Sequence, residues 1–351
     1  MTLPATRPAP EGDSQLELFV SSFVDVVFRD QQDLMENPLC TLGKTPRKEP
    51  IRYQVGDKFL TITANSETGI CTIYDHDILI WAGTQIREAL DRGLPASNKI
   101  VFHPYNLLKG IRRGTSGRDY EELKAAMRRL TGTMVETNIR ADDEQLKRGR
   151  KNKASITFNM LQGFVEVNAS SEGDDRWAII LPDWFYQGIV NHRLVLSIDS
   201  DYFLLSSGLE RWLYRIFRKH AGHQELGWRF TMRQLHIKSC SPQRFSNFAL
   251  DVRKAIARIN EREQSGEPGS KGLPGYQIEI TRNDEGEEVV SGVSRAHLAM
   301  THPGFEPKKN PRRRVGQGGM HPQRWDNRPL AKLVGKGKTA KPSPEDDGNL
   351  G

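Results

Sequence analysis

Apolar residues recur along this chain with two different periods. Over residues 51–74 they alternate with polar residues, which predicts three short strands, the third over 69–74. Over residues 75–92 they recur every three or four positions, which predicts a helix that Asp75 caps and Gly93 ends. Strands and helices are therefore both expected in the N-terminal half.

A helix-turn-helix pattern comes next. A short helix begins at Pro104, and a capping box of Ser116 and Asp119 starts a second helix. Apolar residues at helical spacing form the buried stripe of the second helix, namely Tyr120, Leu123, Met127 and Leu130. Strands are predicted over 133–139 and 155–167, with a charged loop between them. This order of elements is that of a winged helix, whose second helix fits the major groove of a duplex.

The C-terminal half repeats this order of elements. A helix is predicted from Asp199 or Asp201 to about Gly222. A capping box of Thr231 and Gln234 then starts a short helix. The repeat concerns architecture and not residue-by-residue similarity.

A long helix follows in this second module. Ser241 caps it, Pro242 fills its first turn, and it extends to about Arg262. Its predicted buried stripe consists of Phe245, Phe248, Val252, Ile256 and Ile259. A β-hairpin that turns within residues 283–286 closes the module.

The predicted fold class is α+β, with two tandem winged-helix domains and disordered N- and C-terminal tails. Each domain is a helix-turn-helix plus a β-hairpin wing, and 351 residues suffice for two cores. The predicted domains are a disordered N-terminus (1–14), an N-terminal winged-helix domain (15–170), a C-terminal winged-helix domain (171–298) and a basic disordered tail (299–351).

Positive charge is concentrated in two stretches of the chain. The formal net charge is +7, and residues 299–351 hold 11 Lys and Arg against 5 Asp and Glu. Residues 99–153, which contain the first helix-turn-helix, hold 14 Lys and Arg against 7 Asp and Glu. Charge clustered on a module with a groove-sized helix indicates duplex nucleic acid as the partner. The tail suits a nonspecific electrostatic arm.

Candidate DNA contacts in the first module face away from the apolar stripe. The predicted residues are Arg112, Arg113, Arg118, Lys124, Arg128, Arg129, Arg148, Arg150, Lys151 and Lys153. Arginines on the helix suit phosphates or guanine edges in a major groove, and the basic loop KRGRKNK suits a minor groove. The alternative is an ordinary solvated helix face and a solvated loop.

Candidate DNA contacts in the second module lie around the start of the long helix and along its polar face. They are Lys238, Ser239, Gln243, Arg244, Asn247, Lys254 and Arg258. Gln and Asn near a helix N-terminus suit bidentate contacts to adenine, while Lys and Arg further along suit phosphates. Ordinary surface polarity is the alternative.

Patterns that would indicate catalysis are incomplete. Residues 43–45 resemble the end of a phosphate-binding loop, but Pro38 stands where that motif requires glycine. His220 and His223 lack the further ligands that a metal site needs. We therefore expect a protein that is not an enzyme and has no catalytic residues, metal or other cofactor.

Cysteine usage and hydropathy bear on location. The three cysteines form no C-x-x-C pair, which argues against a disulfide framework or zinc ribbon and fits a reducing cytosol. No apolar run approaches the length of a membrane span, and the N-terminus lacks an apolar signal core. A cytoplasmic location is expected.

Three blocks of sequence resemble a known family. They are FRDQQDLMENPLCTLGK, YDHDILIWAGTQI and PYNLLKGIRRGTSGRDYEELKAAMRRLTGTMVETNIR, and the match covers about residues 16–295. Together they resemble the replication initiator protein A family of bacterial plasmids, which is similar in architecture to tandem winged-helix plasmid initiators. The resemblance implies a plasmid-encoded bacterial protein that binds repeated duplex sites at a replication origin.

We therefore expect a plasmid replication initiator that binds repeated duplex DNA sites at the origin and recruits host replication proteins. The expected partners are double-stranded origin DNA and the host initiator and helicase-loading proteins, with a homodimer left open and no membrane. One alternative is a transcriptional (auto)repressor. The other is a single-stranded DNA-binding protein of replication or repair, for which a platform of exposed aromatic side chains would be the sign.

Overall fold

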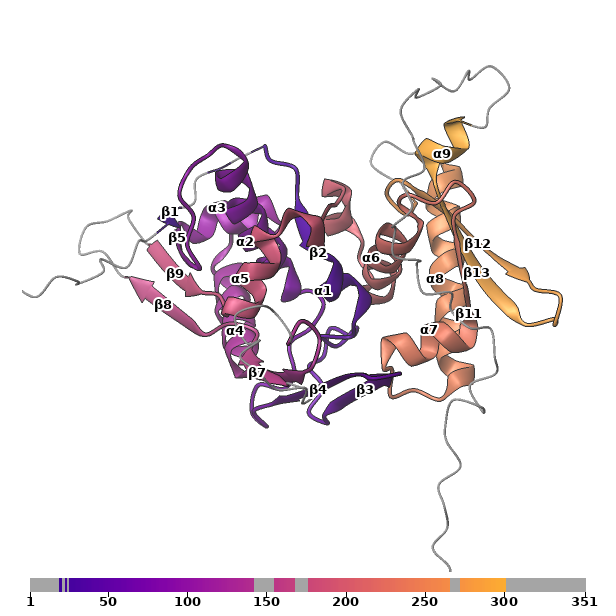
Figure 1. Cartoon of the computed structure of the whole chain (residues 1–351), viewed down its shortest axis with the longest axis horizontal. Helices are drawn as coiled ribbons and strands as arrows, with labels where there is room; N and C mark the ends of the chain where they lie inside the picture. Colours follow the sequence, from indigo (N-terminus) through magenta and orange to yellow (C-terminus); the bar gives the residue numbers. More distant parts are fainter. Residues whose placement is uncertain are drawn as a thin grey trace, which may run out of the picture. The chain divides into compact units, whose positions relative to one another are not determined.

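The described part of the chain is an α+β fold in which segments far apart in sequence share sheets (Figure 1). The structure, a computed structural model, describes residues 19–20, 23, 25–141, 155–167, 176–265 and 272–300. The predicted tails at 1–14 and 299–351 lie wholly or almost wholly outside these residues. None of the described helices combines the length and apolar character that crossing a bilayer requires.

One antiparallel sheet has the strand order β3-β4-β6-β7. Its strands are β3 (Ile51–Val55), β4 (Lys58–Ala64), β6 (Thr133–Thr137) and β7 (Ile156–Asn159). The first two predicted strands are confirmed, whereas the third, over 69–74, is wrong. Ile70 and Thr72 form only isolated bridges there. The backbone turns because the Thr72 amide donates to the Asp75 carboxylate, just before the next helix.

A second sheet has the strand order β1-β5-β9-β8. Its strands are β1 (Phe19–Val20), β5 (Lys99–Phe102), β8 (Gly163–Val167) and β9 (Arg176–Ile180). The strand predicted over 155–167 is therefore two strands, β7 and β8, in different sheets. Between them the chain passes through Met160 and Leu161, whose buried side chains join the core.

Three helices of the N-terminal part begin where the sequence predicts, namely α2 (His76–Asp91), α3 (Pro104–Gly110) and α4 (Gly117–Gly132), although the Asp75 side chain makes no capping bond to α2. A further helix, α5 (Asp183–Val190), was not predicted. The capping box of Ser116 and Asp119 is present at the start of α4. Helices α2 and α5 approach closely at Gly83, where a Cβ would lie 2.8 Å from Cδ1 of Ile189.

A small strand pair connects this part to the rest of the chain. Strand β2 (Arg29–Gln31) pairs with β10 (Val195–Ser197), and α1 (Gln32–Glu36) follows β2 directly. We call residues 19–197 the N-terminal part and residues 200–300 the C-terminal part. Helix α1 packs against α6 (Gly208–Ala221), and buried apolar side chains of both parts form one hydrophobic cluster.

The C-terminal part consists of helices on a three-stranded sheet with the order β11-β13-β12. Its elements after α6 are β11 (Trp228–Thr231), α7 (Met232–Ser239), α8 (Phe245–Ser265), β12 (Tyr276–Arg282), β13 (Glu288–Ser294) and α9 (Arg295–Met300). The capping box of Thr231 and Gln234 and the hairpin turn within 283–286 are confirmed.

Two predicted helix starts in this part are wrong. The residues at Asp199 and Asp201 begin only a short 3-10 helix, η2 (Ser200–Leu204), and α6 starts after it. Helix α8 begins at Phe245 rather than at Ser241. The Ser241 hydroxyl accepts a bond from the amide of Gln243 two residues on, which is a local turn that competes with helix.

The same strand order occurs in both parts. In β5-β9-β8 and in β11-β13-β12, the strand before a short helix pairs with the second strand of a later β-hairpin. The hairpin of β8 and β9 therefore corresponds to that of β12 and β13. Strands β6 and β7, between which the basic loop lies in the sequence, pair with each other in the other sheet. Strand β9 lies beyond residue 170, the predicted domain boundary, yet pairs with β5.

Candidate nucleic-acid interface

Helix α4 has one exposed face and one face that packs into the protein core. The predicted stripe residues Leu123, Met127 and Leu130 are buried. On the other side, the Arg118 side chain is 87% exposed, and its one partner among the described residues is its helical neighbour Glu122, at 3.1 Å. Arg128 is exposed and its side chain has no partner among the described residues. These two arginines are open to a ligand.

Other predicted contacts of the first module are engaged within the protein. Arg129 donates to both carboxylate oxygens of Asp75 at 2.8 and 2.7 Å, and Lys124 pairs with Glu166 at 2.8 Å. Arg113 donates to Asp77, and Arg112 donates to Ser200 of the C-terminal part. Arg148, Arg150, Lys151 and Lys153 lie outside the described residues.

Helix α8 presents polar residues along one face. Asn247 and Lys254 are exposed, as is Arg244 just before the first turn, and their side chains have no partners among the described residues. Gln243 donates to Asp251 at 3.0 Å and also precedes the helix. Arg258 is half exposed and lies 3.3 Å from the carboxylate of Glu210. Phe245, predicted to be buried, is 38% exposed.

Lys238 and Ser239 are buried at the end of α7. Lys238 pairs with Glu36, and the Ser239 hydroxyl donates to the carbonyl of His236 at 2.8 Å. Glu36 also pairs with Lys219 and, at 2.8 Å, with His220. Burial by itself raises the pKa of Glu36, but the hydrogen bond from His220 and the charges of the lysines together hold it well below its ordinary value.

Sequence reasoning missed the charge pairs that join the two parts. Helix α6 is buried along most of its length and still carries Arg211 and Arg215. Arg211 donates to both carboxylate oxygens of Asp77 at 2.8 and 2.6 Å. Arg215 donates to Asp30 at 2.8 Å. A signal for these pairs is present in the sequence, because the two arginines lie among the apolar residues Trp212, Leu213 and Phe217. A charge buried in such a helix requires a partner of opposite charge.

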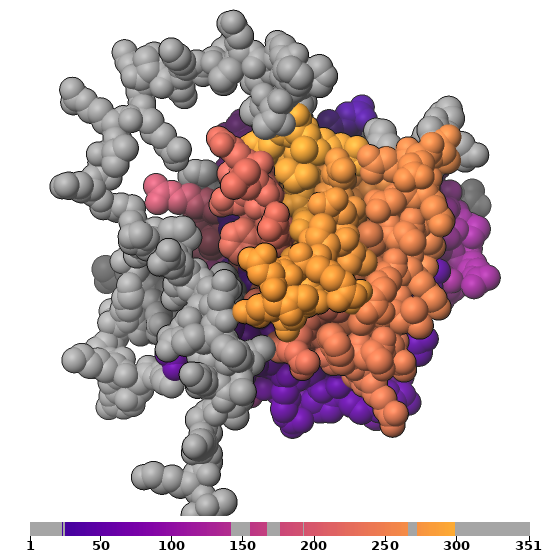
Figure 2. All heavy atoms as spheres, turned by 90° about the vertical axis from the view of Figure 1, so that its right-hand side faces the viewer, coloured from indigo at the N-terminus to yellow at the C-terminus, as the bar shows by residue number. Residues whose placement is uncertain are grey.

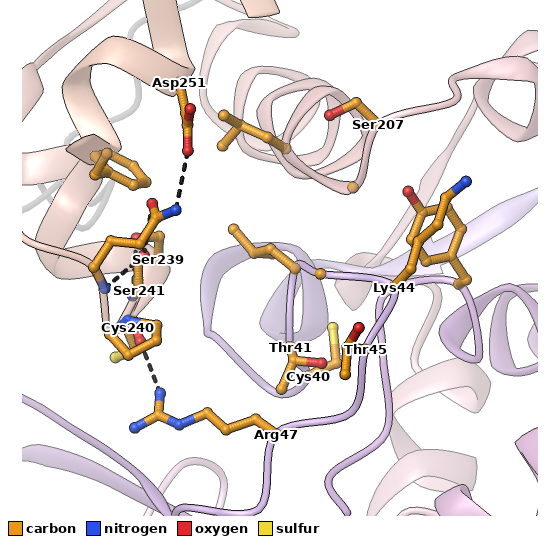
Figure 3. A pocket seen from close by; sticks show the side chains of 18 of the residues that line it. Cys40, Thr41, Lys44, Thr45, Arg47, Ser207, Ser239, Cys240, Ser241 and Asp251 are labelled. Atoms are coloured by element: carbon orange, nitrogen blue, oxygen red, sulfur yellow. Dashed lines mark hydrogen bonds between the residues drawn. The ribbon is translucent and has the colours of Figure 1, made fainter.

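A groove of about 560 Å³ opens between the two parts. Its walls are the loop 40–47, the start of α6, the α7–α8 turn and one face of α8 (Figure 3). Arg47 reaches across it and donates to the Cys240 carbonyl at 3.1 Å. Burial raises the pKa of the Cys40 and Cys240 thiols to about 12 and about 11, so both stay protonated at neutral pH. The described residues contain no cluster of three or more His, Cys, Asp or Glu that suits a metal ion.

A family model described as Replication initiator protein A matches residues 29–278. The chain belongs to this family. A candidate replication protein of Wigglesworthia glossinidia brevipalpis is 29% identical to the initiator over 248 residues, which is 70% of this chain and 86% of that protein. A role in replication initiation therefore follows from family membership.

Solved structures resemble the initiator in fold. Domains 2 and 3 of RctB match with a TM-score of 0.53 and 15% identity, over 74% of this chain and 96% of that one. A second structure of these domains gives a TM-score of 0.47 at 14% identity. At 15% identity the first likeness concerns the fold alone, and it supports the mixed α+β arrangement of the initiator.

Proposed function

We propose that the initiator binds repeated duplex sites at a plasmid replication origin, in the bacterial cytoplasm, through two winged-helix modules. It recruits host replication proteins to the DNA it has bound. It acts by positioning and distorting the duplex and is not an enzyme. Family membership supports the replication role, and the DNA contacts are argued from the described surface.

The repeated strand order supports the two winged-helix modules. In each set a helix, a strand, a short helix and a long helix precede a hairpin that forms a sheet with the first strand. In the first set, β6 and β7 of another sheet come between the long helix and this hairpin. We place the long helices α4 and α8 in major grooves, because each is the second helix of its helix-turn-helix, the one that enters the groove in a winged helix. The first module then extends through β9, and the second begins with α6.

The exposed face of α8 carries the proposal. Asn247 and Lys254 are exposed there, Arg244 is exposed just before the helix, and no side chain of the described residues engages them. Figure 2 shows α8 beside the hairpin of β12 and β13, which also pack together. A helix with free polar side chains next to a hairpin suits direct reading of bases by the helix and contact of the hairpin with the backbone.

Selection of binding sites from random duplexes tests this assignment. Asn247→Ala should relax the selected motif at one or two base pairs, because an amide side chain near the start of the helix suits adenine. Asn283→Ala, in the hairpin turn, is unsuitable as a control because its side chain holds that turn. Gln277→Ala, exposed on β12, is the matched control. An unchanged motif with Asn247→Ala would remove α8 as the reading helix.

A further inference from the structure

The groove between the two parts adjoins the face of α8 that we assign to DNA. Lys254 and Arg258 belong both to that face and to the groove lining. Across the groove lie Lys44 and Thr45 from the loop 40–47 of the N-terminal part (Figure 3). Any strand that runs along this face of α8 therefore passes the loop as well.

The positive charge of the groove is only partly neutralised. Arg47 is engaged by the carbonyls of Cys240 and Pro50, and Arg258 by Glu210. Lys44 and Lys254 have no carboxylate partner among the described residues. Asp251 is the acidic residue among the described lining residues; it is half-buried, and Gln243 donates to it. Two ammonium groups, one from each part, therefore remain available to an anion.

The loop that carries Lys44 is held firmly in place. Gly208, the first residue of α6, packs so tightly on it that a Cβ would lie 1.8 Å from the Leu42 carbonyl oxygen. The Lys44 ammonium lies 5.9 Å from the ring centroid of Tyr74, whose hydroxyl donates to the Ser206 carbonyl at 2.8 Å. A fixed loop presents its charge at low entropic cost.

The lining favours a phosphate over a base. Its aromatic residues are Tyr74 and Phe248; Phe248 is buried, and the Arg211 guanidinium lies 4.7 Å from the ring centroid of Tyr74. Neither offers a free ring face for stacking. Hydroxyls of Thr45 and Ser207 line the groove instead, and Ser207 makes no capping bond to its own helix. Hydroxyl and ammonium donors are what phosphate oxygens accept from.

We propose that this groove is a phosphate clamp, in which Lys44 and Lys254 hold backbone phosphates of the strand that α8 reads. The inference rests on the proposed function and deepens it, because it gives the N-terminal part a contact beside the reading helix of the C-terminal part. A backbone contact between the parts fixes their orientation on the duplex without contributing to base choice.

Salt-dependent binding of the full chain to its selected duplex tests the clamp. The slope of log affinity against log salt is negative, and Lys44→Ala and Lys254→Ala should each make it less steep by about 0.9. The selected motif should stay the same. Lys48→Ala is the matched control, since this lysine is exposed in the same segment but does not line the groove. Because Lys44 and Lys254 are exposed, all three variants should keep the thermal stability of the parent.

A second measurement identifies the phosphate. Neutral methylphosphonate groups are placed one at a time along each strand of the duplex. At one position the neutral group should weaken binding by the parent protein. The same group should not weaken binding by Lys44→Ala, which already lacks the contact. It should weaken binding by Lys48→Ala as much as by the parent. Slopes and position effects for Lys44→Ala equal to those for Lys48→Ala would overturn the clamp.

The competing occupant is a free phosphate compound. Calorimetry with inorganic phosphate and with ATP tests it without DNA. The clamp would also be overturned if the parent bound inorganic phosphate or ATP, Lys44→Ala abolished that binding, and Lys44→Ala kept the salt slope of the parent for DNA. If the parent protein binds no duplex at all, the proposed function fails. If it binds duplex with normal dependence on Asn247 and none on Lys44, the clamp alone fails.

Discussion

Two adjacent arginines on α4 have opposite surroundings. Arg128 is exposed without a side-chain partner among the described residues, whereas Arg129 holds Asp75, which is 2% exposed. Arg129→Ala should lower the free energy of unfolding by about 3–5 kcal/mol, because it leaves a buried carboxylate unpaired. Arg128→Ala should leave stability unchanged and weaken duplex binding by about 1–3 kcal/mol if it reaches a base.

Urea denaturation and DNA titration of both variants separate the two roles. The structure requires a large stability loss for Arg129→Ala and none for Arg128→Ala. Equal losses would mean that the Arg129–Asp75 pair does not stabilise the fold. Binding by Arg128→Ala at the affinity of the parent would mean that α4 faces solvent.

Glu36 makes stability depend on pH. Its pKa is lower in the folded protein than its ordinary value of 4.5. The resulting stabilisation is complete above that value and is lost as the pH falls below it, because the unfolded chain takes up the proton first. Glu36→Gln should destabilise the protein at pH 7 and should lose less further stability on acidification than the parent.

Denaturation midpoints measured from pH 7 to pH 3 check this prediction. Glu49→Gln is the matched control, since the Glu49 side chain is 78% exposed. The control should follow the parent throughout. Equal acid sensitivity of Glu36→Gln and the parent would contradict the assignment of Glu36 as the partner of three basic groups.

Sequence periodicity located exposed faces but not partners. Helical spacing put Arg118, Arg128 and Arg129 together on one side of α4. Arg129 nonetheless turns to Asp75, 54 residues away in the chain. Lys238 and Ser239 were predicted to contact DNA because they precede the long helix, yet both are buried, and Lys238 pairs with Glu36. Such pairings depend on the tertiary fold, which a linear pattern does not contain.

At the scale of elements, capping chemistry was the most informative signal. The boxes at Ser116 and Thr231 both begin the helices they predict, because their bonds are local. The strand predicted over 69–74 fails because a local turn at Thr72 overrides alternation. The strands on either side of the basic loop, β6 and β7, pair as predicted. The single strand predicted over 155–167 fails, because β7 and β8 join different sheets.

The capping box of α7 gives an element-scale prediction. The Thr231 hydroxyl accepts from the Gln234 amide at 3.2 Å, and the Gln234 side chain accepts from the Thr231 amide at 2.9 Å. Thr231→Ala should destabilise the protein by about 1 kcal/mol. The double variant with Gln234→Ala should lose less than the sum of the two single losses, because the bonds are reciprocal. Strict additivity in urea denaturation would contradict a coupled box.

At the scale of the whole molecule, the repeat of strand order was only partly foreseen. Two helix-turn-helix patterns are visible in the sequence because each is local. The pairing of β9 with β5, in which Lys99 lies opposite Ile180, 81 residues further along the chain, is not. The groove at Lys44 could not be predicted from the sequence either. Residues 43–45 do not complete a nucleotide-binding motif, and only the tertiary fold places them in one groove lining with residues of α8.

The basic tail gives a whole-molecule prediction. Residues 299–351 hold 11 Lys and Arg against 5 Asp and Glu. Truncation after Met300 should weaken binding to all duplexes alike and flatten the salt slope, because such an arm contacts phosphates without reading bases. Site selection with the truncated protein should return the motif of the full chain. A changed motif would assign specificity to the tail.

The most direct test of the central claim compares duplex with single-stranded DNA. The full chain is titrated at one fixed salt concentration against a duplex that carries its selected site and against each separated strand. Because the free polar side chains lie on a groove-sized helix, the duplex should bind more tightly than either strand. Tighter binding to a non-repetitive single strand would contradict the account.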